Sequence, residues 1–367
     1  TPQPSPIPMP TTATTYHPAV DLLRDLIRFP SLSGQEAAIA DFVEGYVEAA
    51  GLSVGRHGDN VYFGIGEGED VLLLNTHLDV VPPSEGHPFD PFDPVVKDGE
   101  LYGRGSVDAK ASGAAMTTAL LELAREGWTP PNGRVVVALT TCEESGGGYN
   151  GLEDLRPHLP PLRAGLVGEP TRLRPCIAQK GLLILKLHAH GTSAHAGRAH
   201  LGDNAISRAA RDIQRLDALT LDREDPHLGT PLVSVTTIEG GTARNVIPDR
   251  CTFAVDIRTT PAYTHDEIVA EIEALVESEV EVYSDRFVPV ATDENERIVR
   301  ACRAALPDAE PFGSPTASDW VFLHDIPVVK IGPGRSTRSH TAGERIALDE
   351  VERAVDAYKA IIRAYYA

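Results

Sequence analysis

Short runs of consecutive apolar residues alternate with helix-like segments along this chain, and several of these runs lead into charged side chains. These runs lie within the mainly apolar segments 71–74 (VLLL), 134–139 (RVVVAL), 162–167 (LRAGLV) and 326–331 (IPVVKI). Mainly apolar segments of this length are typical of strands that are buried on both faces of a parallel sheet. Together with the helical segments between them, they predict the α/β class with a mostly parallel central sheet.

The first run leads to His77 and Asp79, which are two residues apart. Side chains with this spacing project from the same side of a strand, and the carboxyl ends of parallel strands are where open α/β sheets bind ligands. A carboxylate that takes the second ring proton of a histidine orients that histidine as a metal ligand. The pair alone fits a hydrogen-bonded structural histidine at least as well.

Two adjacent carboxylates, Glu143 and Glu144, follow the run at 134–139. Packed side by side they repel each other, and one of them holds a raised pKa unless a cation neutralises the pair. This arrangement suits a metal ligand beside a general base, whereas a solvated acidic loop is the alternative. Glu169 follows the run at 162–167 in the same way.

Asp108 and His340 complete the candidate ligands. Asp108 precedes an amphipathic helix over 114–125, where it could instead cap the helix, and His340 lies in a loop after the run at 326–331. Imidazole and carboxylate ligands without thiolate suit zinc, and also cobalt or manganese. A carboxylate shared by two groups of ligands suits a two-metal site. The four cysteines lack paired spacing and suggest neither a thiolate site nor a disulfide framework.

The middle of the chain has a different pattern, with strand, helix, two strands, helix and strand over about 181–289. This order is the layout of an open-faced, ferredoxin-like α+β sandwich. Because candidate ligands precede and follow it, we expect it to be a lid or dimerisation domain inserted into a catalytic domain of residues 17–180 and 290–367. Residues 1–16 are rich in proline and threonine and carry no charge, which predicts a disordered leader.

The composition limits the partners. A formal net charge of −20 argues against nucleic acid or an anionic membrane as a partner, because both require a basic surface. No apolar run approaches the length of a membrane span, and no signal pattern opens the chain. We therefore expect a cytoplasmic globular protein, in which an anionic small-molecule substrate needs a local basic pocket.

In residue type and order, these motifs resemble those of the two-zinc exopeptidases and deacylases, a family that includes acetylornithine deacetylase, succinyl-diaminopimelate desuccinylase, aminoacylase and glutamate carboxypeptidase. The resemblance covers the chain after the leader. It implies two zinc sites that share one carboxylate: His77, Asp108 and Glu169 for one ion, and Asp108, Glu144 and His340 for the other. It also implies Glu143 as general base, Asp79 as the residue that orients His77, and a cis peptide bond after Asp108.

The resemblance implies three further roles within the inserted domain. His195, in GTSAHAG, would reach the active site of a partner subunit and help to hold the tetrahedral oxyanion. Asn245 and Arg258 would hold the substrate carboxylate, for which arginine is well shaped. By residue type alone, these three are a loop histidine, a turn asparagine and a surface arginine. The family also implies a homodimer formed through the inserted domain.

The expected function is metal-dependent hydrolysis of the amide bond of an N-acyl amino acid, by a zinc-activated water whose proton Glu143 accepts. The expected types are acetylornithine or acetyl-lysine deacetylase and succinyl-diaminopimelate desuccinylase, with a role in amino-acid biosynthesis. A metallo-carboxypeptidase or dipeptidase is the alternative, because its substrates also present a scissile amide bond and a free carboxylate to such a site. An inactive metal-binding protein is more remote, since Glu143 accompanies a full set of ligands.

Overall fold

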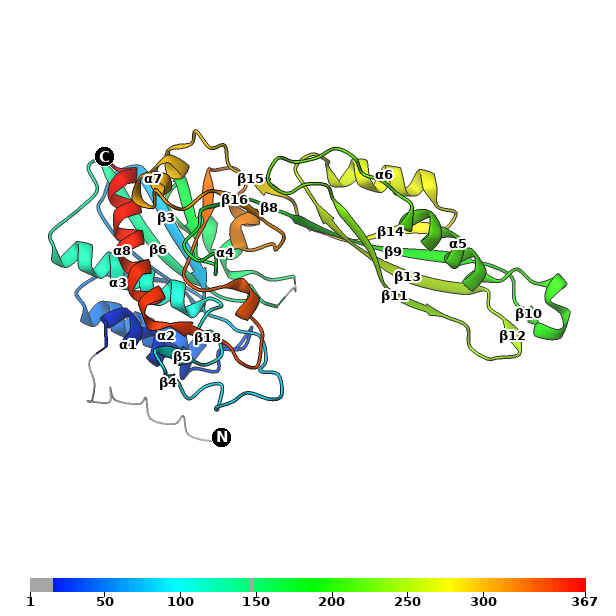
Figure 1. Cartoon of the computed structure of the whole chain (residues 1–367), viewed down its shortest axis with the longest axis horizontal. Helices are drawn as coiled ribbons and strands as arrows, with labels where there is room; N and C mark the ends of the chain where they lie inside the picture. Colours follow the sequence, from blue (N-terminus) through cyan, green and yellow to red (C-terminus); the bar gives the residue numbers. More distant parts are fainter. Residues whose placement is uncertain (1–15, 146–147) are drawn as a thin grey trace. The chain divides into compact units, whose positions relative to one another are not determined.

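The computed structural model describes residues 16–145 and 148–367. They form two compact units (Figure 1): the first contains the chain up to Leu173 together with Ile331–Ala367, and the second contains Arg174–Lys330. Apart from Tyr16, the expected leader lies outside the described residues. The boundaries of the inserted domain, at 181 and 289, stay a prediction.

The first unit is built on a sheet in the order β1-β2-β6-β3-β7. These strands are β1 (Val54–His57), β2 (Asn60–Ile65), β3 (Asp70–His77), β6 (Gly133–Thr140) and β7 (Leu162–Val167). β3 pairs in parallel with β6 on one side and with β7 on the other, while β1 and β2 form an antiparallel hairpin next to β6. The prediction of buried parallel strands with an α/β fold is confirmed, because every residue of β3 after Asp70 is buried.

The first unit also contains helices. They are α1 (Pro18–Ile27), α2 (Ala37–Ala49), α3 (Lys110–Arg125), α4 (Gly151–Leu155), α8 (Leu348–Tyr365) and the short η1 (Arg156–His158) and η4 (Ser336–Arg338). α3 lies against β3 and β6, and both α1 and α8 pack against α3 (Figure 1). A small antiparallel sheet consists of β18 (Arg345–Ala347), β5 (Glu100–Tyr102) and β4 (Val95–Lys97).

The second unit contains a four-stranded antiparallel sheet in the order β11-β13-β9-β14. Its elements are β9 (Gly181–His190), α5 (Ala205–Asp217), β11 (Leu232–Gly240), β13 (Arg250–Thr259), α6 (His265–Leu275) and β14 (Glu279–Phe287). Alternate residues of β9 are buried, and these form one apolar core with α5 and α6. The helices therefore cover one face of the sheet only, as expected for an open-faced α+β sandwich.

Shorter elements complete the second unit. They are β8 (Cys176–Gln179), β10 (Ala194–His195), η2 (Ala196–Leu201), β12 (Val246–Ile247), β15 (Val290–Ala291), α7 (Arg297–Ala305), β16 (Phe312–Ser314), η3 (Asp319–Leu323) and β17 (Val328–Lys330). Within the described residues, none of the helices has both the length and the apolar character needed to cross a bilayer. The cytoplasmic location expected from the sequence stays a prediction.

Lys110 links the start of α3 to the end of α1 by hydrogen bonds. Its side chain is fully buried, and its ammonium donates to the carbonyl oxygens of Leu26, at 3.1 Å, and Phe29, at 2.8 Å. The last carbonyl groups of a helix lack partners within the helix, so a cation at this end is stabilising. Because Lys110 follows Asp108 by two residues, this contact also fixes the backbone next to a candidate ligand.

Replacing Lys110 with methionine is expected to lower the free energy of unfolding by about 1–3 kcal/mol, because two carbonyl oxygens lose a buried donor. Lys359→Met is the matched control. Lys359 lies 2.7 Å from carboxylate oxygens of both Glu122 and Glu126, and such partly exposed pairs contribute at most about 1 kcal/mol. Urea unfolding in the presence of a chelator compares the two variants, and equal losses would contradict the role given to Lys110.

Candidate active site

His77, the last residue of β3, is almost fully buried. Its Nδ1 lies 2.9 Å from the backbone oxygen of Asp79, to which it can donate, and 3.4 Å from a carboxylate oxygen of Asp79. This contact directs Nε2 toward Asp108 and Glu169, at 3.5 and 3.8 Å. Among the described residues, this buried Nε2 has no hydrogen-bond partner. An oriented ring nitrogen without a partner is what a metal ligand requires.

Asp108 also faces His340, which comes from the other end of the chain. His340 Nε2 lies 3.3 Å from Asp108 Oδ2 and 2.8 Å from Glu144 Oε1. These two carboxylates raise the pKa of His340 to about 10. Burial raises the pKa of Asp108, but the neighbouring imidazoles of His340 and His77 outweigh burial and hold it well below its usual range. Two carboxylates and an imidazole thus converge on one point.

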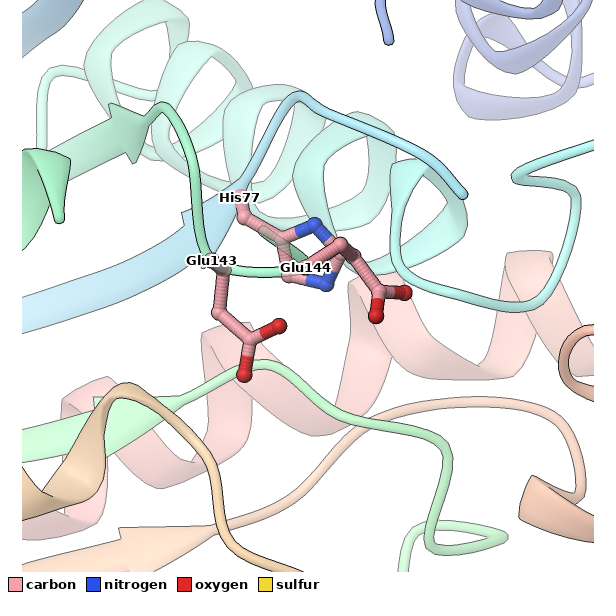
Figure 2. A group of neighbouring side chains, drawn as sticks. All are labelled: His77, Glu143 and Glu144. Carbon is pink, nitrogen blue, oxygen red and sulfur yellow. The ribbon is translucent and has the colours of Figure 1, made fainter. Parts of the chain in front are cut away.

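The structure brings the candidate ligands together in the two sets that the family resemblance implies. Potential ligand atoms of His77, Asp108 and Glu169 lie within 4.8 Å of one another, and so do those of Asp108, Glu144 and His340. Asp108 belongs to both sets. A third set within the same limit consists of His77, Glu143 and Glu144. Figure 2 shows this third set, with both glutamates leaving the loop after β6 beside the ring of His77.

Asp79 positions the loop that carries both glutamates. Its buried carboxylate accepts hydrogen bonds from the backbone N–H groups of Glu143, at 3.1 Å, and Glu144, at 3.0 Å, and from the hydroxyl of Ser33, at 2.7 Å. Burial raises the pKa of Asp79, but contact with His77 and these donors lower it below its usual value. Asp79 therefore stays ionised while it contacts both His77 and the loop.

A second buried carboxylate, Glu36, holds the residue before this loop. Cys142 has a positive φ of 57°, and its N–H donates to Glu36 Oε1 at 3.0 Å. No sequence motif singles out Glu36, because it is one glutamate at the start of an amphipathic helix. The signal that identifies it is tertiary: Glu36 is 1% exposed and contacts a residue 106 positions away.

Two further features concern the backbone beside the ligands. The peptide bond between Asp108 and Ala109 is cis, as the resemblance leads one to expect. Glu169 follows Gly168, whose N–H donates to the carbonyl oxygen of Asn75 at 2.7 Å. The strand pairing of β3 with β7 thus continues up to the residue before Glu169, which brings Glu169 to the same sheet edge as His77.

The arrangement fits one or two divalent metal ions. Its donors are imidazole nitrogens and carboxylate oxygens, which suit zinc, cobalt and manganese. The orphaned Nε2 of His77 points toward Asp108 and Glu169, and the clustered carboxylates need cationic neutralisation in a partly buried place. A proton on His340 supplies part of it in the absence of metal, because the pKa of His340 is raised to about 10.

His195, Asn245 and Arg258 all lie in the second unit. The ring of His195 is exposed, and the backbone N–H of Ala196 donates to the carbonyl oxygen of Asn245 at 2.9 Å, so His195 and Asn245 belong to one local structure. Arg258 lies on β13, where its guanidinium donates to Asp256 at 2.8 and 3.2 Å.

The register of β13 separates Arg258 from the other two residues. Arg258 pairs with Leu182, whereas Arg250, at the opposite end of β13, pairs with His190 near the segment that leads to His195. The eight steps along the strand correspond to about 26 Å at 3.3 Å per residue. Within one chain, Asn245 and Arg258 are therefore not brought together.

A family model and curated relatives match most of this chain. The chain matches Peptidase family M20/M25/M40 over residues 73–364. It is 28% identical to a succinyl-diaminopimelate desuccinylase of Parvibaculum lavamentivorans over 98% of both chains, and 30% identical to one of Cereibacter sphaeroides over 95% of this chain and 99% of that one.

Solved structures share the fold. A tripeptidase from Staphylococcus aureus matches 95% of this chain and 98% of its own, with a TM-score of 0.79 and 21% identity. A dinuclear metal-binding peptidase of the M20 family from Bacillus subtilis matches 94% of this chain and 96% of its own, with a TM-score of 0.72 and 16% identity. Because the family match spans most of the chain, this protein belongs to Peptidase family M20/M25/M40 and is a hydrolase of that family.

Proposed function

We propose that this enzyme removes the acyl group from an N-acyl amino acid by metal-dependent amide hydrolysis, with N-succinyl-diaminopimelate as the first candidate substrate and zinc as the native ion. The observation that carries the proposal is the pair of donor sets that share Asp108. The substrate rests on relatives named succinyl-diaminopimelate desuccinylase, which match this chain over nearly its whole length.

The proposed metal ligands are His77, Asp108, Glu144, Glu169 and His340. When bound, divalent ions at such ligands lower the pKa of a water molecule and polarise a carbonyl group. The chain's own contribution is proton transfer and orientation. Glu143, next to His77, would accept the proton of the attacking water and pass it to the departing amine, while Asp79 holds both the histidine and the Glu143 loop.

We further propose that Arg258 recognises a substrate carboxylate and that His195 stabilises the oxyanion. Arg258 supplies a guanidinium in a protein with a net charge of −20, although a substrate carboxylate has to compete with Asp256 for it. His195 has an exposed ring whose Nδ1 accepts from the N–H of Gly197 at 3.0 Å. Its Nε2 therefore carries the proton and can donate to an oxyanion.

We propose that the active enzyme is a homodimer in which His195 and Asn245 act on the partner chain. The separation between Arg258 and the pair His195–Asn245 along one sheet supports this proposal, because both ends of the sheet contribute proposed substrate contacts. We therefore propose that one metal centre receives the contact of Arg258 from one chain and the contacts of His195 and Asn245 from the other.

The edge strand β11 is the proposed dimer contact. Its sequence, LVSVTTIEG, has only one charged residue, and Leu232 and Ile238 are 55% and 50% exposed. The opposite edge strand, β14, reads EVEVYSDRF, and its pairing with β9 shows two register shifts. Charges and bulges protect an edge strand from pairing with another chain, and β11 has fewer charges than β14.

The proposed substrate class is tested with purified, zinc- or cobalt-loaded enzyme. We expect hydrolysis of succinyl-diaminopimelate in preference to acetylornithine, acetyl-lysine and simple dipeptides, measured by the release of free amine. Preference for dipeptides would instead identify a peptidase. Hydrolysis of none of these compounds, with metal shown to be bound, would favour a protein without catalytic activity.

Glu143→Gln separates the base from the ligands. We expect kcat to fall at least about 100-fold, because general-base catalysis is lost, while metal content stays that of the unmodified enzyme. Glu48→Gln, an exposed glutamate on α2, is the control and should leave both quantities unchanged. Loss of an ion from Glu143→Gln would show instead that the set of His77, Glu143 and Glu144 binds metal.

Asp108→Asn and Glu169→Gln distinguish a shared ligand from an unshared one. We expect elemental analysis to find both ions depleted in the Asp108 variant, and one ion retained in the Glu169 variant, because Asp108 alone belongs to both proposed ligand sets. Retention of one ion after loss of Asp108 would contradict its bridging role.

Ile238→Lys should convert the dimer to a monomer, because a lysine on the β11 edge opposes strand pairing. Val282→Lys, on the β14 edge, is the matched control, since Val282 is 45% exposed, and it should remain dimeric. Light scattering distinguishes twice the mass of one chain from a single chain of 39.4 kDa. An unmodified enzyme with the mass of one chain would rule out His195 acting across subunits.

A further inference from the structure

Glu344 has a buried carboxylate that binds the backbone at Asp108, the ligand that both proposed sets share. Its Oε1 accepts hydrogen bonds from the N–H groups of Val107, at 3.0 Å, and Asp108, at 3.2 Å. Its Oε2 accepts a hydrogen bond from Arg104 at 2.5 Å. Glu344 is 2% exposed and Arg104 is 1% exposed, so this ion pair is shielded from water. The contact therefore acts on the backbone of Asp108 itself.

The same glutamate also belongs to the loop of another ligand, since it follows His340 by four residues. Its N–H donates to the carbonyl oxygen of Thr341 at 3.3 Å, and its carbonyl oxygen accepts from the N–H of Gly103 at 3.3 Å. Directly after it, β18 pairs with β5. The segments that carry Asp108 and His340 are thus joined through the backbone and the side chain of Glu344.

The other ligands depend on different supports. His77 ends β3, a central strand with parallel neighbours on both sides, and Glu169 follows β7, whose pairing with β3 continues to Gly168. Asp108 and His340 lie outside strands, in segments that the sheet does not align. A movement of Glu344 would therefore displace Asp108 relative to His340 more than it would displace His77 relative to Glu169.

The chemistry of the contact makes it strong. Hydrogen bonds to an ionised carboxylate are about twice as strong as those between neutral groups. Nε and Nη2 of Arg104 have no hydrogen-bond partner within the described part of the chain, so loss of Glu344 would leave a buried guanidinium without its carboxylate. Groups that orient metal ligands from outside the ligand set typically change metal affinity by about 10–100-fold when removed.

We propose that Glu344 is a positioning residue that sets the affinity of the metal centre. It acts mainly on the ion held by Asp108, Glu144 and His340, and less on the ion held by His77, Asp108 and Glu169. The inference rests on the proposed metal site. It extends that site to a residue whose side chain contacts one proposed ligand, Asp108, through the backbone N–H of that ligand.

The test compares metal affinity with stability in variants of Glu344, Arg104 and a control residue. Glu344→Gln keeps an oxygen that can accept from the two N–H groups but loses the charge, whereas Glu344→Ala removes the contact. Asp212→Asn is the matched control in the second unit. Asp212 is also fully buried, and its carboxylate accepts from the backbone N–H groups of Glu277 and Ser278 and from Arg215.

Full-length, metal-free enzyme is titrated with Co²⁺, followed by visible absorption and calorimetry, and thermal unfolding is recorded for each variant. We expect one of the two Co²⁺ affinities to fall by about 10–100-fold in Glu344→Ala and by less in Glu344→Gln. The absorption bands of the weakened ion should also change. Asp212→Asn should lose thermal stability but keep both affinities and the spectrum.

The outcomes separate this inference from the proposed function. Unmodified enzyme that binds two ions, together with Glu344 variants that lose only thermal stability, would overturn the positioning role and leave the metal centre intact. Unmodified enzyme that binds no Co²⁺ would overturn both proposals. Should Glu344→Ala fail to fold, unchanged Co²⁺ affinities in Glu344→Gln and in Arg104→Met would also overturn the positioning role.

Discussion

The site depends on the parallel pairing of β3 with strands on both sides. In that register His77 lies opposite Thr140 of β6, and Asn75 lies opposite Val167 of β7. Parallel strands run in the same direction, so the residues after all three strands emerge at one edge of the sheet. Backbone pairing in the buried interior thus determines which side chains can meet, before any interaction among them contributes.

The converging carboxylates repel one another, and a protonated histidine partly neutralises them. In the protein without metal, the carboxylates of Asp108 and Glu144 raise the pKa of His340 to about 10, so the ring is protonated at neutral pH. A metal ion binds neutral imidazole, and binding must therefore release that proton. The affinity for metal should accordingly weaken as the pH falls below this pKa. The carboxylates of the site thus favour binding of a metal ion, but they also favour the proton that competes with the ion for His340.

The sequence predicts the parts of the site that follow strands and leaves out the parts that depend on tertiary contact. His77 and Glu143 were found because an unbroken apolar run precedes them, and the structure confirms both strands. Glu36 and Glu344 lack such a context, and their partners are 106 and 237 residues away. A single glutamate beside a helix or a short strand gives no sign of such a partner.

The buried carboxylates divide into two kinds according to what their oxygens contact. Both oxygens of Asp79 and of Glu344 accept hydrogen bonds from N–H or O–H donors of the protein. Those oxygens are occupied, so these residues fix backbone rather than compete for a metal ion. Asp108 and Glu144 instead face the imidazole of His340, a contact that a metal ion can replace. Asp79 also contacts a histidine, since it lies 3.4 Å from His77 Nδ1, so histidine contact alone does not separate the two kinds. Saturation of both oxygens by N–H or O–H donors of the protein is what marks a supporting carboxylate.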